Sequence, residues 1–152
     1  MPAKAIPEGY HTATPYLVVR GADKTIEFLK KAFGAQPSFE LMMSPDGKVM
    51  HADLKIGDSH IMLSEATDQH PAMQSMVHLY VPNVDAVYQR AVAAGGKSFM
   101  EPKDQFYGDR GAGVTDHSGC SWYIATHIED VSMQDLKKRA EEMYKQQKGK
   151  AA

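Results

Sequence analysis

Pro15-Tyr16-Leu17-Val18-Val19 is an apolar stretch typical of a strand, and an amphipathic helix is predicted over residues 22–33 before Gly34. The same order recurs at Val77-His78-Leu79-Tyr80-Val81, which precedes a second helical pattern over residues 84–94 and the pair Gly95-Gly96. Self-similarity at a fixed shift, here about 62 residues, is the signature of a repeated unit. Further strand-like runs follow each copy, so the sequence predicts two tandem βαβββ modules.

Module one is expected to span residues 10–66. Ser44-Pro45-Asp46-Gly47 supplies the proline and glycine of a turn, which predicts a hairpin around it. Residues 66–75 lack periodicity and are interpreted as the linker between the modules. The expected elements of this module are, in order, a strand at 12–20, a helix at 22–33, and strands at 38–43, 48–56 and 60–65.

Module two is expected to span residues 75–128, and a helical extension to follow over residues 131–148. Ser132-Met133-Gln134-Asp135 fits a helix-capping sequence at the start of this extension. The apolar stripe of the extension is thin, so it either lies on the outside of the domain or contacts a partner subunit. The elements expected in module two are a strand at 76–81, a helix at 84–94, and strands at 97–101, 111–116 and 121–127.

Two similar curved sheets placed side by side enclose a cavity. The predicted fold class is therefore α+β, a single domain with a cup-shaped mixed sheet and a C-terminal helix. Composition agrees with a globular chain, since 43% of the 152 residues are hydrophobic and 24% are charged. A membrane helix needs about 20 apolar residues in a row, and the sequence has no such run.

The charge pattern indicates which partners are not expected, and the single cysteine indicates the cellular compartment. The net charge is −2 and the basic residues are scattered, so neither nucleic acid nor an anionic membrane is expected as a partner. Cys120 has no second cysteine with which to form an internal bridge. With no secretory signal at the N-terminus, this predicts a cytoplasmic protein.

Several segments resemble the vicinal oxygen chelate superfamily, which contains glyoxalase I, extradiol dioxygenases, and fosfomycin- and bleomycin-resistance proteins. The resemblance runs over residues 17–28 and 81–88, Ala94-Gly95-Gly96, Tyr107-Gly108-Asp109-Arg110 and Asp116-His117-Ser118-Gly119. The branch it is most similar to is the broad glyoxalase/bleomycin-resistance-like group with its PhnB-like proteins. The resemblance implies a homodimer, because a second subunit usually covers the open mouth and sheet edge in this superfamily.

Enzymes of the superfamily hold a divalent metal with up to four ligands, one from the first and one from the last strand of each module. Carried across by resemblance, these positions are Thr14, Met62, Met76 and Tyr123. Thioether, hydroxyl and neutral phenol groups are poor substitutes for imidazole or carboxylate on such an ion. The sequence therefore predicts no metal and no other cofactor.

A different set of inward-facing residues results if the strand register differs by two residues, because His60 and His78 then enter the same inward face. His51 and Asp53 alternate with a predicted helix-facing set of Met50, Ala52, Leu54 and Ile56, so they too are expected to face the cavity. A divalent metal site made of His51, His60 and His78 is one interpretation. Hydrogen bonding of these histidines to polar neighbours or ligand is the other, and we favour it.

The sequence leaves two candidate functions for this protein. The first is a metal-independent protein similar to bleomycin-resistance proteins, which binds an aromatic or antibiotic-like small molecule in its cup. The second is a metal-dependent lyase, isomerase or dioxygenase that acts on a small oxygenated substrate. The candidate ligand-binding residues are Thr14, Tyr16, His51, Met62, Met76, His78, Tyr80, Tyr107, Arg110 and Tyr123.

Overall fold

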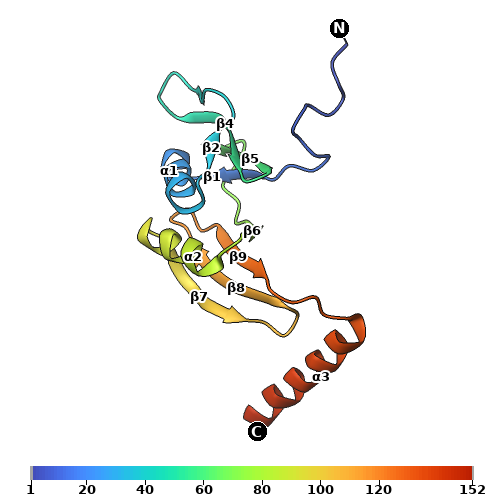
Figure 1. The fold of residues 1–152 in the computed structure, drawn as a ribbon. Coiled ribbons are helices and arrows are strands. Elements are labelled where there is room, and N and C mark those ends of the chain that lie inside the picture. Colours follow the sequence, from blue (N-terminus) through green and yellow to red (C-terminus); the bar gives the residue numbers. More distant parts are fainter. Residues whose placement is uncertain (1, 152) are drawn as a thin grey trace.

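A computed structural model describes residues 2–151 and shows two modules, one after the other along the chain, followed by a helix (Figure 1). The first module consists of β1 (Tyr16–Val19), α1 (Ala22–Phe33), β2 (Gln36–Pro37), β3 (Met42–Met43), β4 (Val49–Ile56) and β5 (Ser59–Glu65). The second consists of β6 (Met76–Tyr80), α2 (Val84–Ala93), β7 (Lys97–Asp104), β8 (Asp109–Thr115) and β9 (Ser121–His127), and α3 (Met133–Lys150) follows it.

Each module forms its own mixed sheet. The order is β1-β5-β4-β2 in the first, where β3 also pairs with β4, and β6-β9-β8-β7 in the second. β1 runs parallel to β5 and β6 runs parallel to β9, whereas the other pairs are antiparallel. The predicted α+β class is confirmed, with one mixed sheet from each module and a C-terminal helix.

The strand register repeats between the modules. Tyr16 lies opposite Met62 in the first sheet, and His78 lies opposite Tyr123 in the second. These pairs are related by nearly the same shift as the sequence repeat, which confirms that the modules are structural copies. Thr14 and Met76 lie two residues before the positions opposite Met62 and Tyr123.

A shared core joins the modules on the helix-covered side of the sheets. α1 and α2 contact each other, and the buried residues form one cluster that includes Leu29 and Leu63 from module one and Ile124 from module two. Trp122 on β9 is fully buried against Phe33 of α1, with ring centroids 5.3 Å apart. Its indole N–H donates to Asp116 at 2.9 Å, so this large side chain has no unsatisfied polar atom.

The first strand is shorter than predicted. The expected strand at 12–20 begins at Tyr16, and the chain before it is not paired as a strand. Pro15 at this boundary has no N–H to donate to a ladder, although its carbonyl accepts a hydrogen bond from the amide of Met62.

A register shift in the β3–β4 hairpin makes the predicted burial of Met50 wrong. Met42 pairs with His51 and Met43 pairs with Val49, so β4 has an extra residue at Met50. A bulge of this kind reverses the alternation of side chains. Val49 is therefore buried, and Met50, predicted to face the helices, is 54% exposed. Of the strand predicted at 38–43, Met42–Met43 forms as β3, and the short strand β2 lies before the predicted range at Gln36–Pro37.

The C-terminal helix extends away from the body of the molecule (Figure 1). Its N-cap is Ser132, as predicted, and it has no buried residue. Arg139 holds it in place by donating to both carboxylate oxygens of Glu129 and to the carbonyl of Phe106. Within residues 2–151, none of the helices is long and apolar enough to cross a membrane.

Candidate functional site

The second sheet carries an aromatic cluster on the face opposite its helix, which we call the second-module face. His78 of β6 stacks on Tyr123 of β9 with ring centroids 4.9 Å apart, and Tyr80 lies beside His78 at 4.8 Å. The hydroxyl groups of Tyr107 and Tyr123 are 3.1 Å apart. Four residues predicted for ligand binding are thus brought into one group.

Glycines in β8 make room for these rings. A Cβ atom at Gly111 would collide with the Tyr123 ring, and one at Gly113 would collide with the Phe99 ring. Glycine inside a strand often marks a place where another group approaches the backbone closely. Here the approaching groups are the aromatic rings of Tyr123 and Phe99.

Asp109 anchors the polar edge of this cluster. It is buried and accepts hydrogen bonds from the Tyr80 hydroxyl and from Nδ1 of His127, each at 2.8 Å. The hydrogen bond to Asp109 raises the pKa of Tyr80. Burial, and then the bond to Tyr107, raises the pKa of Tyr123. Both phenols therefore stay neutral at physiological pH and remain hydrogen-bond donors.

His127 links the cluster to the chain that leads into α3. Its hydrogen bonds, first to Asp130 and then to Asp109, raise its pKa above the ordinary value. A histidine whose pKa is raised on folding stabilises the fold below its unfolded pKa, about 6.5, and this contribution disappears as pH rises through the folded pKa.

We therefore expect Tm to fall as pH rises above about 6.5, with a shallower fall in His127→Gln. Thermal melts of both proteins across this window check the prediction. Because the imidazole is half exposed, salt should reduce the difference between them. Parallel pH profiles would show that His127 does not contribute.

The first sheet has a related open face, the first-module face, with Tyr16, His51 and Met62. The Tyr16 hydroxyl lies 3.1 Å from Nδ1 of His51, and Phe39 stacks on His51 with ring centroids 6.0 Å apart. Beside them is a cavity of about 750 Å³, lined by Tyr16, Val18, Met50 and the start of the linker among others. Three more of the predicted residues are thus close together, but in the other sheet.

The three remaining predicted residues lie outside these two clusters. Thr14 lines a small cavity between the modules, and Met76 is exposed at the start of β6, on the same side of the strand as His78. Arg110 donates two hydrogen bonds to Asp85 at the start of α2 and one to Asp104 of β7. It alternates with Gly111 along β8, so it points to the helix side and away from the second-module face.

Asp53 on the first-module face and its three hydrogen-bond partners are absent from the predicted ligand-binding set. Asp53 is fully buried and accepts hydrogen bonds from Tyr10, Ser38 and His60. Strand alternation indicated that Asp53 faces this side. Ser38 begins a predicted strand, but no sequence signal pointed to Ser38 or to Tyr10 as a partner of Asp53.

The side chains present do not fit a divalent metal centre. The four residues opposite each other across the first and last strands are Tyr16, Met62, His78 and Tyr123, a set with one imidazole and no carboxylate. Phenol and thioether groups are weak ligands for such an ion. Among residues 2–151, no group of three histidine, cysteine, aspartate or glutamate side chains is arranged to hold one.

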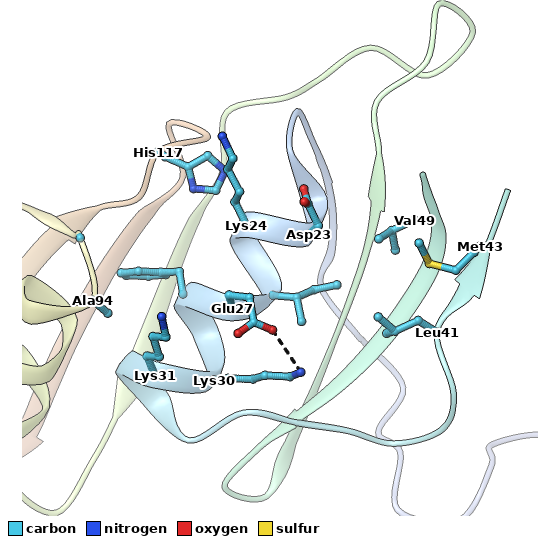
Figure 2. Close-up of a pocket in the computed structure, with 13 residues that line it drawn as sticks. Asp23, Lys24, Glu27, Lys30, Lys31, Leu41, Met43, Val49, Ala94 and His117 are labelled. Carbon is cyan, nitrogen blue, oxygen red and sulfur yellow. Dashed lines mark hydrogen bonds and ion pairs between the residues drawn. The ribbon is translucent and has the colours of Figure 1, made fainter. Parts of the chain in front are cut away.

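A different hollow, of about 450 Å³, lies between α1 and the β3–β4 hairpin (Figure 2). Leu41, Met43 and Val49 form one wall, and α1 contributes Lys24 and other charged side chains to the other. Lys30 within it is paired with Glu27 at 3.3 Å. None of the predicted site residues lies there.

Comparison with known proteins agrees with this architecture. Residues 10–124 match the Glyoxalase/Bleomycin resistance protein/Dioxygenase superfamily. An uncharacterized protein of Mycobacterium bovis is 34% identical over 134 residues, which cover 81% of this chain and 88% of the relative. An uncharacterized protein of Mycobacterium tuberculosis is also 34% identical, over 81% of this chain and 78% of its own length.

Solved structures share the fold at lower identity. TioX from Micromonospora sp. ML1 is 24% identical with a TM-score of 0.62, over 76% of this chain and 99% of TioX. A glyoxalase-related enzyme from Fulvimarina pelagi is 19% identical with a TM-score of 0.62, over 76% and 87% of the two chains. On its sequence and its fold, this chain belongs to the glyoxalase/bleomycin resistance protein/dioxygenase superfamily.

Proposed function

We propose that this protein binds a flat aromatic small molecule on the second-module face, without a metal. The observation that carries the proposal is the exposure of large aromatic side chains there, since Tyr80 is 66% exposed and Phe99 is 51% exposed. Ligand sites combine aromatic walls with a few placed polar groups. His78 and the hydroxyls of Tyr107 and Tyr123 supply such groups.

The rings are held in position before any ligand arrives. Tyr80 is tied to the buried Asp109, Tyr123 to Tyr107, and His78 lies between Tyr80 and Tyr123. Side chains that are already ordered lose little further conformational entropy on binding. A planar ligand would gain stacking area on this surface and would meet hydroxyl groups at its edge.

Binding of a fluorescent naphthalene dye to the full chain tests the proposal. Tyr80→Ala is expected to weaken dye binding about tenfold, because it removes an exposed ring from the stacking surface. Tyr144→Ala is the matched control, since Tyr144 is 62% exposed but lies on α3. Equal dye affinity of both variants and the unaltered chain would contradict the proposal.

We further propose that the protein is a homodimer, in which the first-module face of one copy covers the second-module face of the other. β1 and β6 are each paired on one side only among the described strands, and such edges favour pairing with another chain. Sedimentation at low micromolar concentration should report two chains per particle. A monomer under these conditions would count against the shared site.

A further inference from the structure

The chain before β1, residues 2–14, forms an N-terminal strap that is attached to the first sheet through Tyr10. Residues 2–9 are all exposed and extend away from the body of the molecule (Figure 1). Within the described part of the chain, one hydrogen bond joins the strap to the rest, from the Tyr10 hydroxyl to Asp53. A segment with so few contacts can leave the sheet at a much smaller free-energy cost than global unfolding.

The group that holds Tyr10 comes entirely from the body of module one. Asp53 of β4 is fully buried, Ser38 donates to its Oδ1 at 2.6 Å, and Nδ1 of His60 lies 2.7 Å from the same oxygen. We call these three residues the Asp53 pocket. The other oxygen of Asp53, Oδ2, accepts from the Tyr10 hydroxyl at 2.7 Å, and no other donor among residues 2–151 bonds to it. Only this oxygen depends on the strap.

Tyr10 occupies the Asp53 pocket as a small phenol would. Its ring stacks on the imidazole of His60, with centroids 4.0 Å apart and 20° between the planes. Burial opposes the charge on Asp53, but the hydrogen bonds from Ser38, His60 and Tyr10 outweigh it and lower its pKa. The ionised carboxylate can only accept hydrogen bonds. The pocket therefore suits a flat ring that carries a hydroxyl donor at its edge.

We propose that the Asp53 pocket is a binding site for a small phenol and that Tyr10 is its built-in competitor. Once the strap lifts, a phenol stacks on His60 and donates to Oδ2 of Asp53, so it replaces both contacts of Tyr10. A carboxylate ligand would instead be repelled by the charge of Asp53. The site lies on the first sheet, so it goes beyond the aromatic site proposed on the second-module face.

Competition with the strap sets the direction of the expected effects. Tyr10 is tethered to the pocket, so its effective concentration there is high. The apparent affinity for a free phenol is then reduced to the fraction of molecules in which the strap is open. A change that weakens the contacts of Tyr10 should therefore strengthen phenol binding, and bound phenol should displace Tyr10 in the unaltered chain.

Phenol titrated into the full chain and followed by NMR tests the proposal. Saturating phenol should shift the ring resonances of His60 and move those of Tyr10 to the values of an unstructured chain. Toluene has nearly the same shape but no donor, so it should bind at least about tenfold more weakly. Tyr10 resonances that phenol does not move would overturn the proposal. So would phenol shifts confined to His78, which lies on the second-module face.

Two variants of Tyr10 sharpen the test. Tyr10→Ala should bind phenol at least about tenfold more tightly than the unaltered chain, because the competitor is removed. Tyr10→Phe keeps the packing of the ring but has no donor for Oδ2, so it should fold and should also bind phenol more tightly, by a smaller factor. The matched control is His11→Ala, since His11 is the next residue and is exposed. It should bind phenol as the unaltered chain does, and equal affinities in all four proteins would refute the site.

Discussion

Replacing Trp122 with alanine is expected to lower the free energy of unfolding by about 3–5 kcal/mol. The side chain is fully buried, packs on Phe33 of the other module and donates to Asp116. Its loss would leave a large cavity in the core that both modules share, and would remove the donor to Oδ2 of Asp116. Urea unfolding followed by circular dichroism measures the change.

The neighbouring residue on the same strand provides the contrast. Tyr123 points to the opposite side of β9, where it is half buried against other aromatic rings. Tyr123→Ala should cost less, about 1–2 kcal/mol, and should weaken binding of the naphthalene dye. Equal losses of stability in the two variants would mean that the faces of β9 are assigned incorrectly.

Asp53→Ala is expected to be the other strongly destabilising change, by about 1.5–3 kcal/mol, because it removes the buried carboxylate that accepts from three donors. The donors are the hydroxyls of Tyr10 and Ser38 and Nδ1 of His60. Ser59→Ala is a control in the same sheet, since Ser59 is exposed and its hydroxyl donates to its neighbour Asp58. Urea unfolding again gives the magnitude, and a loss no larger than that of Ser59→Ala would contradict this interpretation.

Asp53 also makes the stability of the fold depend on pH in the acidic range. The pKa of Asp53 is lowered on folding, so its contribution is present above the unfolded pKa of about 3.9 and is lost as pH falls through the folded pKa. Asp53→Asn, which keeps the volume but cannot ionise, should show a weaker pH dependence of unfolding in this acidic range.

Most of the fold could be predicted because it depends on patterns that repeat along the chain. The β1–α1 and β6–α2 units have the same spacing, and the pairing of Tyr16 with Met62 has its counterpart in that of His78 with Tyr123. The failure at Met50 has a local cause. A single extra residue in β4 reverses the alternation, and the surrounding sequence gives no sign of the bulge.

The candidate site was harder to predict because it depends on contacts between distant residues. Alternation placed Tyr80 and Tyr123 on the same face, but no pattern indicated that Arg110 would be held by Asp85 and Asp104 on the helix side. Likewise, Tyr10 reaches Asp53 from a segment without regular structure. Such contacts are set by the tertiary path of the chain, which local periodicity does not encode.

The glycines of β8 have a consequence for how this protein can evolve. Gly111 shares its space with Tyr123, and Gly113 shares its space with Phe99, so each pair of positions holds a roughly fixed total volume. A larger residue at 113 becomes tolerable only after position 99 has become smaller, and the same holds for 111 and 123. In related chains, a larger side chain at one position of a pair should therefore accompany a smaller one at the other. A new ligand preference would need two coupled substitutions, because either one alone leaves a clash or a void.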